Sequence, residues 1–140
     1  MGAHRGLRIS AIVYGVGLIF HTADHVRRGA GFLSTQVQVV GAISTVIGIG
    51  VVVLVLKRHR SAPLFAAAFG PLAGLGAAAA HLLPRWSSFS DSFINARGTG
   101  VTSISWISIS IEVAGAVAMG IFGWLAIPQG RDRKAVPIGG

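Results

Sequence analysis

Four long apolar segments follow one another along the chain, separated by short polar breaks. They extend over roughly 7–26, 35–56, 63–83 and 101–127, and each reaches the length of about 20 residues that a helix needs to cross a bilayer. The breaks contain arginine, lysine, glycine or proline, which end helices. The pattern predicts an all-α integral membrane protein, an antiparallel bundle of four transmembrane helices over 1–127 followed by a basic cytoplasmic tail at 128–140.

The composition supports lipid as the solvent. Of the 140 residues 52% are hydrophobic and 11% are charged, whereas about 25% of a typical soluble domain is charged. The net charge of +8 would suggest nucleic acid in a soluble protein. Here the charges lie between apolar segments, so we expect the lipid bilayer as a partner and no nucleic acid. The absence of cysteine excludes disulfides and thiolate metal sites.

The distribution of positive charge predicts the orientation, because cytoplasmic loops carry more lysine and arginine. One side of the predicted bundle carries eight such residues and the other carries four. We therefore expect a multi-pass protein of the cell membrane with both termini in the cytoplasm and the loop 84–100 outside. The larger set is Arg5, Arg8, Lys57, Arg58, Arg60, Arg131, Arg133 and Lys134, and the smaller is Arg27, Arg28, Arg85 and Arg97.

The end of the first span carries ionisable residues, which are costly in a membrane and therefore informative. These are His21, Asp24 and His25. At 100° per residue all three share one helix face. Two histidines four residues apart on one face can bind one metal ion. Asp24 is then either a fourth ligand or a carboxylate that orients an imidazole through its N–H.

A third histidine is expected at the same depth. The first and third spans both run outward, and His81 precedes Arg85 by about as many residues as His25 precedes Arg28. Three imidazoles should therefore meet near the outer surface, where Asp91 of the external loop could close over them. Imidazole with carboxylate suits copper, zinc or iron. Haem b held between the first and third helices is an alternative.

Glu112 lies near the middle of the fourth span, with Ser108 and Ser105 on the same face. A carboxylate at this depth should face protein. It could relay protons or accompany an ion, or it could simply hydrogen-bond to another helix.

These residues leave several functions open. The first is metal binding by His21, His25, His81 and Asp24, for metal handling or metal-dependent redox chemistry. The alternatives are a haem b subunit, a non-catalytic small subunit or assembly partner of a larger membrane complex, and an ion or proton transporter that uses Glu112. A homo-oligomer or a membrane complex is the expected assembly. Whether the protein is an enzyme does not follow from its sequence.

Overall fold

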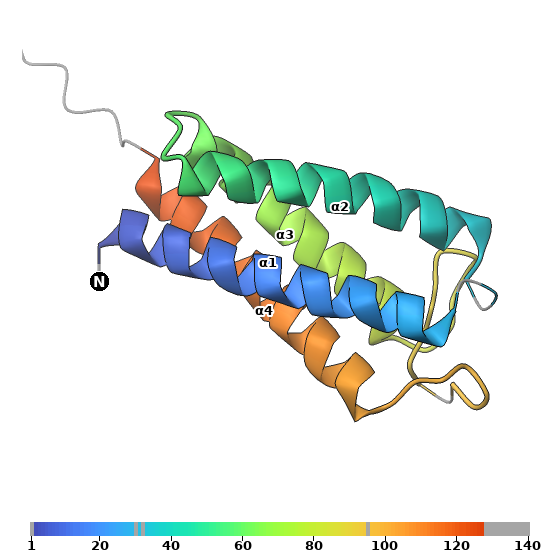
Figure 1. Cartoon of the computed structure of the whole chain (residues 1–140). Coiled ribbons are helices and arrows are strands. Elements are labelled where there is room, and N and C mark those ends of the chain that lie inside the picture. Colours follow the sequence, from blue (N-terminus) through green and yellow to red (C-terminus); the bar gives the residue numbers. More distant parts are fainter. Residues whose placement is uncertain (1, 30, 32, 95, 128–140) are drawn as a thin grey trace, which may run out of the picture.

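The computed structural model is a bundle of four helices (Figure 1). It describes residues 2–29, 31, 33–94 and 96–127, so the predicted tail at 128–140 lies outside the described residues. The helices are α1 (Ala3–Arg28), α2 (Thr35–Leu56), α3 (Ala62–His81) and α4 (Ser103–Ala126). Each is long and apolar enough to cross a membrane. The prediction of an all-helical four-helix bundle is confirmed.

Local signals explain where the helices begin and end. The Ser34 hydroxyl accepts the backbone N–H of Val37 at 3.2 Å and caps the start of α2. Thr102 and Ser105 form a reciprocal capping box at the start of α4. The first helix begins at Ala3 rather than near residue 7 as expected, so its first turns carry basic residues.

Helix α4 is the centre of the bundle. It makes its most extensive contacts with α1 and α3, whereas α2 touches α1 and α3 far less. Small residues allow this approach, since a Cβ on Gly115 would lie 2.5 Å from the backbone nitrogen of Tyr14, and one on Gly70 would lie 2.5 Å from the carbonyl oxygen of Ala116. The glycines therefore set the close spacing of α1 and α3 against α4.

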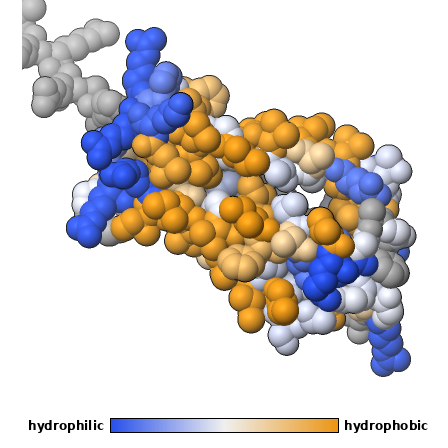
Figure 2. All heavy atoms as spheres, in the orientation of Figure 1, coloured by the Kyte–Doolittle hydropathy of each residue, from blue (hydrophilic) through white to orange (hydrophobic). Residues whose placement is uncertain are grey.

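The outer surface of the bundle is largely apolar. Exposed fractions reach 69% for Ile19, 70% for Val46 and 72% for Leu72, which lie on α1, α2 and α3. Figure 2 shows this hydrophobic surface between ends that carry hydrophilic residues. A soluble protein rarely exposes so much contiguous apolar surface. The distribution is the one expected for helices that face lipid.

Candidate metal centre

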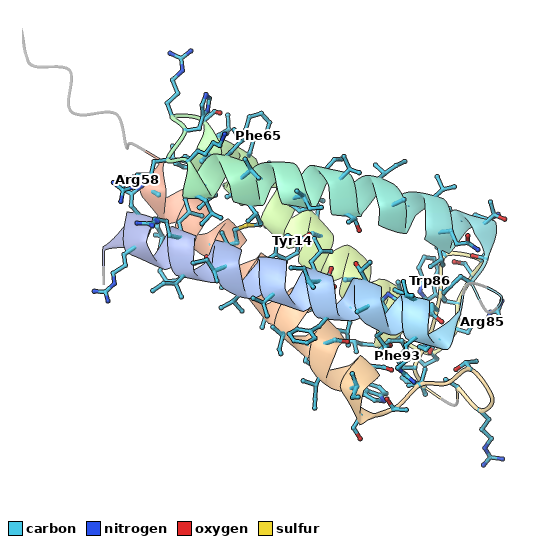
Figure 3. The ribbon with its side chains drawn as sticks, in the orientation of Figure 1. Tyr14, Arg58, Phe65, Arg85, Trp86 and Phe93 are labelled. Atoms are coloured by element: carbon cyan, nitrogen blue, oxygen red, sulfur yellow. The ribbon has the colours of Figure 1, made fainter. Side chains whose placement is uncertain are left out.

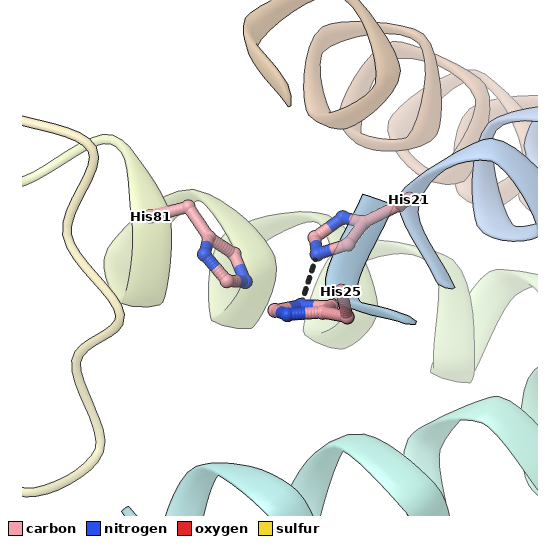
Figure 4. A group of neighbouring side chains, drawn as sticks. All are labelled: His21, His25 and His81. Atoms are coloured by element: carbon pink, nitrogen blue, oxygen red, sulfur yellow. Dashed lines mark hydrogen bonds between the residues drawn. The ribbon is translucent and has the colours of Figure 1, made fainter. Parts of the chain in front are cut away.

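Three histidines meet at one end of the bundle (Figure 4). His21 and His25 lie on the last two turns of α1, and His81 is the last residue of α3. Their potential ligand atoms all lie within 4.8 Å of one another. His21 and His81 are buried and His25 is half-buried. The structure thus brings together the three histidines that the sequence predicted to meet.

The rings are in direct contact. The Nε2 atoms of His21 and His25 are 2.7 Å apart, and the ring centroids of His21 and His81 are 4.6 Å apart. Two Nε2 atoms at this distance repel each other if both present a lone pair. A metal cation bound by both nitrogens removes that repulsion, and so does an N–H on one nitrogen that donates to the other.

Each imidazole has an oxygen atom close to its Nδ1. The Nδ1 of His21 lies 2.8 Å from Oε2 of Glu112, and that of His81 lies 3.0 Å from the backbone carbonyl oxygen of Asp91. The Nδ1 of His25 lies 3.8 Å from Oδ2 of Asp91. The carbonyl of Asp91 assigns the N–H of His81 to Nδ1. The lone pair then resides on Nε2, and Figure 4 shows the second ring nitrogen of His81 directed toward His21 and His25.

A glycine brings Glu112 to His21. A Cβ on Gly17 would lie 2.4 Å from the backbone nitrogen of Glu112 and 2.6 Å from its Cα. The absence of a side chain therefore lets α4 approach α1 one turn before His21. Nδ1 of His21 and Oε2 of Glu112 are both buried and have no aligned hydrogen bond to any described residue. Nδ1 of His21 and Oε2 of Glu112 therefore face each other at 2.8 Å as a close polar pair.

The loop after α3 folds back over the histidines. The backbone N–H of Phe93 donates to the carbonyl of His81 at 2.9 Å, and the indole N–H of Trp86 donates to the carbonyl of Ala79 at 2.9 Å. These bonds place Asp91 beside the rings of His25 and His81. The Asp91 carboxylate lies on the Nδ1 side of these rings, 3.5 Å from Nδ1 of His81, and its role as a lid over the cluster stays a prediction.

Arg28 holds the Asp91 carboxylate in place. Its Nη1 and Nη2 atoms donate to the two carboxylate oxygens at 2.7 and 2.8 Å, and its guanidinium carbon lies 5.1 Å from the ring centroid of Phe93. Burial alone would raise the pKa of Asp91, but hydrogen bonds from His81 and Arg28 outweigh it and keep that pKa well below its usual range. Asp91 is therefore a fixed anion beside the imidazoles.

Asp24 lies outside the group of three histidines. Its Oδ1 accepts from Nε and Nη2 of Arg27 at 3.0 and 2.7 Å, and Nη2 of Arg27 also donates to the carbonyl of Gly100 at 2.8 Å. The pair ties the end of α1 to the segment before α4. The role of Asp24 as a fourth ligand stays a prediction. The hydrogen bonds from Arg27 to its carboxylate do not support that role.

The serines of α4 are buried with Glu112 but bond elsewhere. Ser108 donates to the carbonyl of Ser105 at 2.9 Å, and the Ser105 hydroxyl accepts the backbone N–H of Thr102 at 3.1 Å. Within the described part of the chain neither serine hydrogen-bonds to Glu112. The contact of Glu112 with His21 was not predicted, because the sequence analysis considered Glu112 separately from the histidines.

The sequence nevertheless held a signal for this contact. His21 lies seven residues before the end of α1 at Arg28, and Glu112 lies nine residues after the start of α4 at Ser103. At about 1.5 Å per residue, the two depths differ by about 3 Å. The sequence analysis used Arg28 for orientation and depth and did not predict that this buried cation pairs with Asp91 beside the cluster.

Comparison with known proteins gives no family for the chain, since no protein-family model, no curated protein and no solved structure matches it.

Proposed function

We propose that this chain is a multi-pass membrane protein that binds one transition metal ion through His21, His25 and His81. The observation that carries the proposal is the arrangement of the three imidazoles, whose potential ligand atoms lie within 4.8 Å of one another and each of which has an oxygen atom near its Nδ1. Carboxylate or carbonyl partners on the second ring nitrogen are the usual support of metal-bound histidines. Such partners fix the tautomer and raise the basicity of the ligand.

The surface and the charge pattern support the membrane part of the proposal. The exposed apolar residues of the four helices suit lipid. We place the helices across the bilayer in alternating directions with both termini in the cytoplasm, because more lysine and arginine lie at that end. The histidines then lie near the outer surface, where an ion from outside the cell or from a partner protein can reach them.

The spacing of the rings favours a bare ion over haem. A porphyrin requires its axial imidazoles on opposite faces of a large flat ring. Here the rings of His21 and His81 contact each other edge to face. A tetrahedral ion with metal–nitrogen bonds of about 2.0–2.1 Å requires its ligand atoms about 3.3 Å apart. The ligand atoms already lie within 4.8 Å of one another, so small rotations of the side chains suffice.

The charges around the cluster favour a cation. When both Asp91 and Glu112 are ionised, they and the guanidinium of Arg28 leave one negative charge beside three neutral imidazoles. Nitrogen ligands with outer carboxylates suit zinc, copper or iron. No described carboxylate joins the three histidines as a ligand, so water or a substrate would complete the coordination, as in open catalytic sites. Metal handling and metal-dependent redox chemistry both fit this arrangement.

Metal content per chain tests the proposal. Protein purified in detergent without chelator should contain about one ion per chain, whereas His81→Gln should lose most of it, because two ligands bind far more weakly than three. His59→Gln is the matched control, since His59 is exposed and its Nδ1 contacts the Ser61 hydroxyl at 2.7 Å. Equal metal content in wild type and His81→Gln, both folded, would refute the proposal.

The contact between Glu112 and His21 favours a second candidate, proton or cation transfer through the bundle. Oε2 and Nδ1 are buried and 2.8 Å apart, so a rotation of either side chain that aligns them would open a path for a proton. Proton flux into proteoliposomes that contain the metal-free protein tests this candidate. Flux above that of empty liposomes that Glu112→Gln abolishes would support it, and background flux from the wild type would reject it.

A further inference from the structure

A cavity lies at the end of the bundle away from the histidines. It has a volume of about 780 Å³ and lies between the start of α1 and the turn that joins α2 to α3. Figure 3 labels Arg58 at this end and Arg85 at the opposite end. Among the described residues, six basic or imidazole side chains and no acidic side chain line the cavity; the six are His4, Arg5, Arg8, Arg58, His59 and Arg60.

The arginines of this cavity have no carboxylate partner among the described residues. The ion pairs of arginine there involve Arg27 and Arg28, which lie at the histidine end. Four guanidinium groups from two separate segments therefore face one hollow, and no carboxylate of the described residues compensates their charge. Guanidinium matches the geometry of phosphate oxygens and binds them through paired hydrogen bonds.

The cavity is apolar on its other side. Leu7 and Val55 are buried beneath it, and the exposed side chains of Ile9 and Ile12 continue it along α1. Figure 2 shows hydrophilic residues at this end directly adjoining the hydrophobic surface. A molecule that fills the cavity must therefore be anionic at one end and apolar at the other, which describes a phospholipid better than a free phosphate.

The backbone at Arg58 is consistent with a binding role. Helix α2 ends with the N–H of His59 bonded to the carbonyl of Leu54 and the N–H of Arg58 bonded to that of Val55, which is the Schellman pattern. Arg58 occupies its left-handed position with φ 55°, where glycine is favoured. An arginine there carries a backbone cost that glycine would avoid. Its side chain lines the cavity.

We propose that this cavity is a binding site for an anionic phospholipid, with the phosphate among Arg5, Arg8 and Arg58 and the acyl chains along Ile9 and Ile12. Basic pockets at the cytoplasmic ends of membrane helices recognise such headgroups. The site is independent of the metal centre, because the two occupy opposite ends of the bundle.

Lipid binding to the whole purified protein in detergent tests this proposal. Phosphatidylglycerol should raise the melting temperature, and phosphatidylcholine or inorganic phosphate at equal concentration should not. The variant Arg8→Gln/Arg58→Gly should bind phosphatidylglycerol at least about tenfold more weakly, because each surface arginine adds a factor of about five. Arg85→Gln/Arg97→Gln removes equal charge from exposed positions at the other end and should bind as the wild type does.

Arg58→Gly alone separates lipid binding from a structural role. Without lipid it should melt at or above the wild-type temperature, because glycine suits the left-handed position, and with phosphatidylglycerol it should gain less than the wild type. Equal weakening in both double variants, stabilisation by phosphatidylcholine, or full stabilisation by inorganic phosphate would each overturn the proposal.

Discussion

The Oε2 atom of Glu112 lies 2.8 Å from Nδ1 of His21, across the interface between α4 and α1. The contact joins a carboxylate deep in the bundle to a histidine of the three-imidazole cluster. If His21 binds a metal ion as proposed, Glu112 is a positioning residue for that ligand.

Replacing this carboxylate should weaken metal binding. We expect Glu112→Gln to lower metal affinity about 10- to 100-fold, the usual effect of losing an outer partner of a histidine ligand, while the protein stays folded. Competition with a chromophoric chelator measures the affinity, and a thermal melt checks the fold. Unchanged affinity would show that the contact does not support the ligand.

The variant Asp24→Asn tests whether Asp24 is a metal ligand. Because its carboxylate bonds to Arg27, we expect Asp24→Asn to keep the metal content of the wild type and to lower thermal stability. Elemental analysis of folded protein gives the answer. If the metal is lost while the melting temperature is kept, Asp24 is a ligand.

Gly17 should be intolerant of even one methyl group. A Cβ there would lie 2.4 Å from the backbone of Glu112, so Gly17→Ala must push α4 away from α1, at a cost of about 1–3 kcal/mol. It should also reduce metal affinity by separating Glu112 from His21. Gly50→Ala on α2 is the matched control, because no atom lies within 4 Å of the added Cβ. It should be neutral or stabilising, since alanine favours helix by about 1 kcal/mol over glycine.

The pair of Asp91 and Arg28 should make the stability of the metal-free protein depend on pH. The pKa of Asp91 is held below its usual range in the folded state, so the stabilisation is complete above the unfolded pKa of about 3.9 and is lost as the pH falls below it. Asp91→Asn should cost about 3 kcal/mol at pH 7 by leaving Arg28 unpaired. This difference should shrink below about pH 4. A difference that is constant with pH would contradict the assignment of the pair.

Orientation can be measured with single cysteines, because the chain has none of its own. We expect Ser88→Cys to react with an impermeant thiol reagent in intact cells and Ser61→Cys to react only after lysis. The opposite labelling would place the histidines at the cytoplasmic end and the basic cavity outside.

The sequence predicted the four helices and the three histidines because both depend on local rules. Apolar length determines a span, and a spacing of four residues places His21 and His25 on one face. The position of His81 beside the other two histidines was predicted only from its matching depth in the third span. The same argument applied to Glu112 would have placed it near His21, but its position in the middle of a span suggested an isolated group.

The remaining parts of the site depend on which helix faces touch, which the sequence does not specify. Gly17 is one of 20 glycines, and nothing local shows that it admits the backbone of α4. Arg27 and Arg28 are neighbours with the same chemistry. Yet Arg27 bonds to Asp24 and Arg28 bonds to Asp91, because successive residues point about 100° apart on a helix.

X-ray absorption spectroscopy of the protein loaded with one equivalent of zinc tests the metal centre most directly. We expect about three imidazole nitrogens at about 2.0–2.1 Å, one further oxygen ligand and no sulfur, with the imidazole signal reduced in His81→Gln and unchanged in His59→Gln. A spectrum dominated by water oxygens, or zinc that remains unbound at one equivalent, would contradict the proposal that these three histidines form a metal site.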